Sequence, residues 1–157
     1  MTLHTISLSI VFDAPLDQAW SEIVDWQSQG NWMLQTKVWA PPAPSPIEQE
    51  IFAFTGPLYR WHPRFKKIGI LDHMRVSYWN PPFQCDVLHI GSVIQGTGTF
   101  SLKAISESKT RFDWSETIEA PRFIFQLIRP FFTLGVWISL QRLARILKNQ
   151  RSERRGE

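Results

Sequence analysis

The final third of the chain constrains the fold most strongly, because three strand-like runs there lead into one long helix. Glycines and short polar turns separate the runs, which are Phe83–Ile90, Val93–Ala104 and Thr110–Glu119. Pro121 and Pro130 punctuate the passage into an amphipathic helix that is expected to end near Gln150. A curved antiparallel sheet packed on one long helix encloses space, so this pattern predicts an α+β container.

The first half of the chain predicts more strands and two short helices. His4–Phe12 alternates apolar and polar residues, as a half-buried strand does. Asp13 is expected to cap a short helix over Leu16–Asp25, and Trp26–Trp32 is a candidate second helix. Three further strands are predicted, at Met33–Trp39, Glu50–Phe54 and Ile70–Trp79. The expected sheet therefore has about six to seven strands.

Two segments between these strands are expected to be irregular. Ala40–Pro46 contains four prolines in seven residues, which predicts an extended loop. Gly56–Phe65 also carries prolines and reads as a loop or an irregular edge. From their positions, both are candidates for a lid over the mouth of a cavity.

Length and charge limit the class of protein. The 157 residues predict one domain over 1–150, followed by a basic frayed tail over 151–157. Arg142–Glu157 holds six Lys/Arg and two Glu, a net charge of +4, so the rest of the chain is close to neutral. A neutral body with a basic end is not a nucleic-acid-binding pattern. The basic end is interpreted as a solvated helix terminus, with weak contact to an acidic membrane surface or a protein partner as the alternative.

Metal, cofactor and membrane signals are weak in the sequence. Cys85 is the sole cysteine, and the four histidines lack metal-ligand spacing, so no metal and no cofactor are predicted. No serine lies in a Gly-x-Ser-x-Gly motif. Met1–Phe12 alternates instead of forming an apolar signal core, and Phe131–Leu140 is judged too short to span a bilayer. A cytoplasmic protein is expected.

Alternation sorts the late strands into two faces. A two-residue turn at Gly91-Ser92 would pair His89 with Ile94 and Ile90 with Val93. The inner face is then apolar and aromatic, with His89 and Glu116 as its polar members. Its predicted residues are Phe83, Cys85, Val87, His89, Ile94, Gly96, Gly98, Phe100, Leu102, Phe112, Trp114, Glu116 and Ile118.

The inward polar residues and glycines each have two interpretations. Glu116 and His89 are either structurally paired groups or polar anchors and acid–base groups of a cavity. One strand separates them, so a flat sheet would place them about 10 Å apart and favour a bridging ligand or water. Gly96 and Gly98 either permit curvature or leave room for a ligand.

The order of strand, two short helices, antiparallel strands and a long C-terminal helix is the helix-grip order. Phe12-Asp13-Ala14-Pro15 leading to Ala19-Trp20, the Trp32 region and the late strands carry this likeness. The chain resembles the START/Bet v 1-like (SRPBCC) superfamily, specifically its bacterial polyketide cyclase/dehydrase and lipid-transport group. Four motifs suggest one bacterial branch of that group: Trp79-Asn80-Pro81-Pro82, His89-Ile90-Gly91, Gly96-Thr97-Gly98-Thr99-Phe100 and Trp114-Ser115-Glu116.

The resemblance implies a deep apolar cavity between the sheet and the helix. Members of the superfamily bind lipids, sterols, polyketides, isoprenoids or plant hormones, and some cyclise or dehydrate their ligands. No residue set in this chain matches a catalytic signature. The first hypothesis is therefore a binding or carrier protein for a small hydrophobic ligand. The residues expected to bind it are Trp32, Val87, His89, Gly98, Phe100, Phe112, Trp114, Glu116, Val136 and Leu140.

Two alternatives remain open from the sequence. The second hypothesis is an enzyme of cyclase or dehydratase type, in which His89 or Glu116 acts as the general acid or base. The third is a module that binds a protein or a membrane through Trp137–Arg155. The sequence leaves the oligomeric state undetermined.

Overall fold

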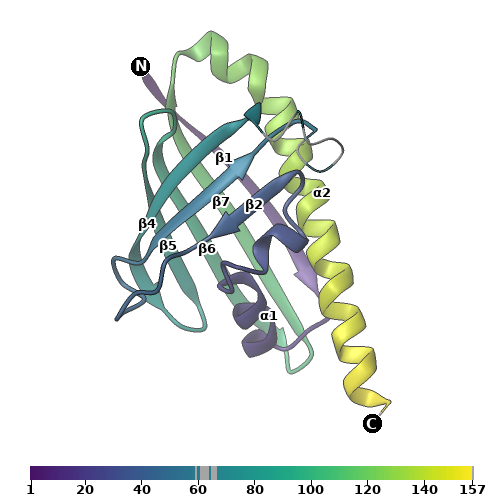
Figure 1. Ribbon diagram of the computed structural model, residues 1–157. Helices are drawn as coiled ribbons and strands as arrows, with labels where there is room; N and C mark the ends of the chain where they lie inside the picture. Colours follow the sequence, from purple (N-terminus) through teal and green to yellow (C-terminus); the bar gives the residue numbers. More distant parts are fainter. Residues whose placement is uncertain (59, 61–63, 65–66, 157) are drawn as a thin grey trace.

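The structure is a computed structural model that describes residues 1–58, 60, 64 and 67–156. A curled seven-stranded antiparallel sheet has the order β1-β7-β6-β5-β4-β3-β2 (Figure 1). Its strands are β1 (Thr2–Phe12), β2 (Thr36–Trp39), β3 (Glu50–Thr55), β4 (Ile70–Asn80), β5 (Gln84–Ile90), β6 (Gln95–Ser106) and β7 (Lys109–Ala120). The predicted α+β helix-grip fold is confirmed.

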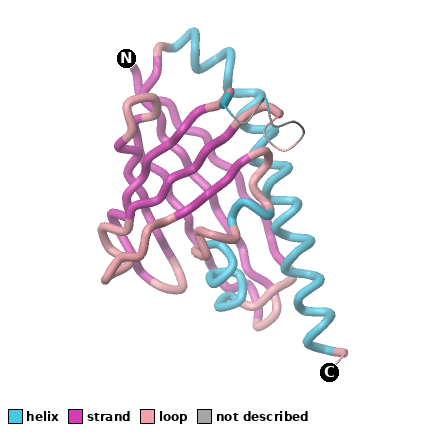
Figure 2. The backbone as a smooth tube through the Cα atoms, in the orientation of Figure 1, coloured by secondary structure: helices cyan, strands magenta, loops and turns pink. Residues whose placement is uncertain are grey.

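Three helical segments accompany the sheet. They are α1 (Leu16–Ile23), the 3-10 turn η1 (Gln29–Asn31) and the long helix α2 (Arg122–Arg155). Figure 2 shows α2 running along the open side of the curled sheet, with its first turns beyond the end of the strands. Leu140, Leu143 and Leu147 bury the sheet-facing side of α2 in the main core.

The predicted faces of the late strands are confirmed except at Phe83, which precedes β5 and is 49% exposed instead of facing inward. Cys85, Val87 and His89 are buried in β5, while their neighbours in sequence are half-buried or exposed. The same alternation buries Phe112, Trp114 and Glu116 in β7. Period-two alternation sends these side chains to one face, so the concave face is mostly aromatic.

The predicted β5–β6 hairpin register is wrong. Ile90 pairs with Gln95 and His89 pairs with Gly96, so four residues (91–94) form the turn instead of two. The pairing moves by two residues, an even number, and each side chain therefore keeps its predicted face. In the observed register Gly98 pairs with Val87, so the residues that meet across the two strands differ from those predicted.

The helix boundaries also differ from the predictions. Pro130 lies inside α2, which runs unbroken from Arg122 to Arg155, including the segment expected to fray beyond Gln150. Figure 1 shows α2 changing direction in its first part, where Pro130 lies, as expected for a proline that cannot donate to the preceding turn. Buried Phe125 anchors the part before the proline against β1 and β7, which explains why the helix is not broken there.

Near the N-terminus the helices and a strand are shorter than predicted. Pro15, not Asp13, is the N-cap of α1, and it provides no side-chain cap. Only Gln29–Asn31 of the predicted second helix is helical, and β2 begins at Thr36, later than the predicted Met33.

The expectation that no segment could span a membrane is wrong on length and composition. Within the described residues, α2 is the one helix long and apolar enough to cross a bilayer. In its most apolar window only 22% of the residues are buried, although α2 packs along the sheet. Its first half therefore exposes an unusual amount of apolar surface.

The predictions for the two irregular segments compare differently with the structure. Ala40–Pro46 forms the predicted loop, but none of its residues lines the cavity described below, so it is not a lid. Gly56 and Pro57 do line that cavity. Most of the remaining segment, namely residues 59, 61–63 and 65, lies outside the described residues.

Candidate functional site

A cavity of about 540 Å³ lies between the concave face of the sheet and α2. Strands β3 to β7, the η1 region and the middle of α2 all contribute to its wall. Most of the lining side chains are apolar, among them Met33, Ile51, Met74, Val87, Phe100, Trp114, Phe132 and Val136. The volume lies within the usual range for small-molecule sites.

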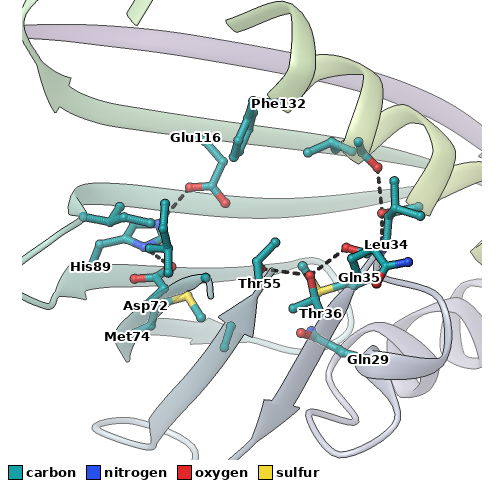
Figure 3. A pocket seen from close by; sticks show the side chains of 18 of the residues that line it. Gln29, Leu34, Gln35, Thr36, Thr55, Asp72, Met74, His89, Glu116 and Phe132 are labelled. Atoms are coloured by element: carbon teal, nitrogen blue, oxygen red, sulfur yellow. Dashed lines mark hydrogen bonds and ion pairs between the residues drawn. The ribbon is translucent and has the colours of Figure 1, made fainter. Parts of the chain in front are cut away.

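A buried cluster of three ionisable side chains is the main polar feature of the wall. His89 Nδ1 lies 2.8 Å from Asp72 Oδ2, and His89 Nε2 lies 2.8 Å from Glu116 Oε2 (Figure 3). The indole N–H of Trp114 donates to Glu116 Oε1 at 2.9 Å. Asp72 comes from β4, His89 from the neighbouring β5, and Glu116 from β7, which lies beyond β6, so the sheet sets the geometry of the cluster.

The expected separation of His89 and Glu116 is wrong, because their side chains are in direct contact. The absence of a side chain on the intervening strand explains the difference. A Cβ placed at Gly98 would lie 3.0 Å from both carboxylate oxygens of Glu116. The Glu116 side chain therefore occupies the space above Gly98 and reaches across β6.

Gly96, the other glycine of β6, is required because of its backbone conformation. It lies opposite His89 in the sheet, and its φ of 147° belongs to a region that side chains disfavour. A Cβ at this position would lie 1.9 Å from the carbonyl oxygen of Thr117. The two glycines thus serve the strand geometry and the buried cluster, and Gly98 leaves no free volume for a ligand.

The carboxylates determine the protonation of His89. Burial by itself lowers the pKa of His89, but the hydrogen bonds and charges of Asp72 and Glu116 outweigh burial and raise this pKa to about 10. At neutral pH the ring is therefore a cation that donates one N–H to each carboxylate. The side chains of His89 and Glu116 are only 5% and 8% exposed, so the pair is well shielded from water.

One acceptor of the cluster remains unused. Asp72 Oδ1 is buried and has no hydrogen-bond partner among the described residues. Asp72 lines the cavity, as do His89 and Glu116. A buried carboxylate oxygen without a hydrogen-bond partner is unfavourable, so the cluster is incompletely satisfied at Asp72.

A second polar group lies across the cavity but is satisfied internally. The Ser139 hydroxyl accepts from the Leu34 N–H at 2.9 Å and donates to the Gly135 carbonyl at 2.7 Å. Thr36 Oγ1 donates to the Leu34 carbonyl and lies 2.9 Å from Thr55 Oγ1. Figure 3 shows Thr36 and Thr55 on the opposite side of the pocket from His89. These contacts fix α2 and the η1–β2 connection to the sheet.

The structure brings six of the ten sequence-predicted ligand residues to the cavity wall. They are Val87, His89, Phe100, Trp114, Glu116 and Val136. The other four do not line it. Trp32, Phe112 and Leu140 are buried in the core, and Gly98 lies beneath the Glu116 carboxylate.

Sequence reasoning missed Asp72. The residue belongs to a predicted strand, and the alternation of Asp72, Met74 and Val76 could have placed it on the inner face. Its hydrogen bond with His89 could not be predicted, because that contact depends on the β4–β5 register, in which Met74 pairs with His89.

Among the described residues, no group of three or more His, Cys, Asp or Glu side chains could hold a metal ion.

No protein-family model and no curated protein matches this sequence. Solved structures nevertheless share its fold. The Zhui aromatase/cyclase from a Streptomyces species superposes with a TM-score of 0.71 at 9% identity, covering 95% of this chain and 96% of that chain. A START superfamily protein from Mycobacterium smegmatis gives 0.65 at 13% identity, covering 96% and 98%. A protein from Nitrosomonas europaea gives 0.72 at 12% identity, covering 94% and 96%. The chain therefore has the START/Bet v 1-like (SRPBCC) fold.

Proposed function

We propose that this protein binds a small hydrophobic molecule, of the lipid, polyketide or isoprenoid class, in the cavity between the sheet and α2. The observation that carries the proposal is an apolar cavity of about 540 Å³ with one buried polar cluster in its wall. Ligand sites typically combine a largely apolar wall with a few polar groups that fix orientation. The neighbours named above, an aromatase/cyclase and a START superfamily protein, agree with this class of ligand.

Apolar burial would supply most of the affinity. If the cavity removes about 300 Å² of apolar ligand surface from water, the gross gain is near 7 kcal/mol at about 25 cal/mol per Å². Association costs of at least about 4 kcal/mol reduce this figure. Moderate affinity is therefore expected from the apolar wall alone, and the polar cluster would improve selectivity.

The cluster favours a ligand with a hydrogen-bond donor at its polar end. Asp72 Oδ1 is the acceptor that lacks a partner, whereas both ring nitrogens of His89 are already engaged. That oxygen is buried, so a hydroxyl or amine group of the ligand would satisfy it after a turn of the Asp72 carboxylate toward the cavity, and a purely hydrocarbon ligand would leave it unsatisfied.

Acid–base catalysis is the weaker alternative. A general base at neutral pH needs a free lone pair, and a protonated His89 held between two carboxylates has none. Glu116 is likewise engaged, by His89 through one oxygen and by Trp114 through the other. The cluster is better suited to orient a polar group than to move a proton, so a carrier role is favoured over a cyclase or dehydratase.

Native mass spectrometry of the freshly purified protein, followed by organic extraction, tests the proposal. A discrete bound mass that is extractable into organic solvent is expected. A protein without bound mass that also fails to take up members of a lipid and polyketide panel would refute the proposal.

Gly135 offers a matched pair of variants for the same experiment. It lines the cavity, and nothing lies within 4 Å of a Cβ built at this position. Gly135→Leu should fill part of the cavity and reduce ligand uptake without unfolding the protein, because leucine is also a better helix former. Gly135→Ala is the control, since it gives a similar gain in helix propensity with little added volume. Equal uptake by both variants would argue against this cavity as the site.

A further inference from the structure

The exposed side of α2 changes character along the helix. In its second half, the exposed positions include Arg145, Lys148 and Asn149, as expected for a solvated surface. In its first half, most of the exposed positions are apolar. We call the following six residues the apolar face: Phe123, Ile124, Leu127, Ile128, Phe131 and Leu134.

The apolar face is not part of the protein core. Its members are between 40% and 74% exposed, and they recur three or four residues apart, so they share one side of the helix. The other side of the same stretch is anchored: Phe125 is buried and stacks on His4, and Val136 is buried in the main core. The helix thus holds the apolar face in a fixed orientation toward solvent. Contiguous exposed apolar surface of this kind marks an interaction site.

The charges on the first half of α2 are both positive. Arg122 and Arg129 are exposed and lie with Gln126 and Thr133 on a polar strip, on the opposite side of the helix from the apolar face. From Arg122 to Ser152 the helix carries six Lys/Arg residues and no Asp or Glu. A second copy of the chain would bring like charges together, whereas an anionic surface would complement them.

The apolar face also adjoins the cavity. Phe131 lines the cavity and is nevertheless 74% exposed, so it lies at the opening. Ile70 at the start of β4 shares both properties, with 47% exposure. Figure 1 shows the first turns of α2 at the end of the sheet where the chain begins. The opening and the apolar face therefore lie at the same end of the molecule.

From these observations we infer that the first half of α2 docks on the surface of an anionic lipid bilayer. The helix lies in the plane of the interface with the apolar face among the upper acyl chains, and the positive charges of α2 attract the protein to the anionic surface. Trp137, half exposed at the end of the face, suits the interfacial layer. Docking in this way would place the opening of the cavity against the membrane. The sequence pointed to the basic C-terminus for such contact, but the structure favours the other end of the helix.

Vesicle flotation tests the inference on the full chain. The probes are vesicles of phosphatidylcholine alone and of phosphatidylcholine mixed with phosphatidylglycerol. The test variant combines Phe123→Ser with Leu127→Ser, because these side chains are 72% and 70% exposed and line no part of the cavity. The control is Ile105→Ser, a 56% exposed apolar residue at the end of the sheet near the β6–β7 turn.

The wild-type protein should float with phosphatidylglycerol vesicles and bind less to phosphatidylcholine alone. The double variant should bind roughly tenfold less or weaker still, since two large apolar side chains no longer enter the interface. Ile105→Ser should bind like the wild type. These results hold whether or not the cavity carries a ligand, so they stand apart from the uptake experiment.

Three outcomes would overturn the inference. The first is a wild-type protein that does not bind the anionic vesicles. The second is a double variant that binds them as well as the wild type. The third is a wild-type dimer in sedimentation velocity that the double variant converts to a monomer, which would show that a second copy covers the face.

Discussion

Raising the pH should destabilise this protein well below the range in which ordinary alkaline unfolding begins. The responsible group is His89, whose pKa is raised from 6.5 to about 10 by Asp72 and Glu116 against the opposing effect of burial. The folded state therefore holds a proton that the unfolded state releases above pH 6.5. This contribution to stability is fully present below pH 6.5 and is lost as the pH rises toward 10.

The size of the effect follows from proton linkage. One proton held only by the folded state changes the free energy of unfolding by about 1.4 kcal/mol per pH unit. Between pH 6.5 and about pH 8.5 the expected loss is therefore roughly 2 to 3 kcal/mol. For a domain stabilised by only about 5 to 15 kcal/mol, such a loss is easily measured.

The upper limit of the pH window is set by Cys85. Burial, together with the nearby charge of Asp86, raises the pKa of this thiol from 9.0 to about 12. The thiol has the same sign of linkage and would add to the loss of stability above pH 9. Measurements below that pH isolate the contribution of His89.

Urea unfolding followed by tryptophan fluorescence at several pH values supplies the measurement. The control is His4→Gln, since His4 stacks on Phe125 and forms no ion pair within the described part of the chain. This variant should keep the pH slope of the wild type. A flat stability profile between pH 6.5 and 8.5, or titration of the His89 ring by NMR near its ordinary value of 6.5, would refute the reasoning.

Three further predictions concern the buried cluster and the strands that hold it. Glu116→Gln should lower the pKa of His89, because one of its two carboxylate partners is lost; NMR titration measures this, and an unchanged pKa would contradict the assigned contact. Gly98→Ala should destabilise the fold by about 1 to 3 kcal/mol, because the new methyl group would crowd a carboxylate held by two hydrogen bonds. Urea unfolding measures this, and a stabilised variant would show that Glu116 can move away. Cys85 should resist thiol reagents at neutral pH until the protein unfolds, because it is buried and protonated; rapid labelling of the folded protein would show that β5 opens.

The inner face of the sheet could be predicted from the sequence, because it depends on a local rule. Alternation placed Val87, His89, Phe100 and Glu116 on one face, and this holds in the structure. A hairpin register that was wrong by two residues did not disturb the assignment, since side chains alternate with a period of two. The most reliable predictions were those that depend on the residue pattern within a single strand.

The composition of the buried cluster could not be predicted. Asp72 lies 17 residues before His89 in the sequence, and the hydrogen bond between them depends on the pairing of β4 with β5. The contact of His89 with Glu116 depends on Gly98, whose importance appears only when β6 separates the two strands. Distances across several strands follow from register and side-chain reach, and the sequence specifies neither directly.

The length of α2 likewise depended on tertiary packing as well as on local sequence. Pro130 signalled a boundary by local propensity, but burial of Phe125 before it and Val136 after it keeps the helix continuous. By itself, the sequence determined an α+β chain with an apolar concave face and a long C-terminal helix, because those features rest on periodicity and composition. Only the tertiary structure decided that His89 is held as a cation between two carboxylates and that the first half of α2 faces solvent. Both facts depend on which surfaces remain uncovered after residues far apart in the sequence have packed together.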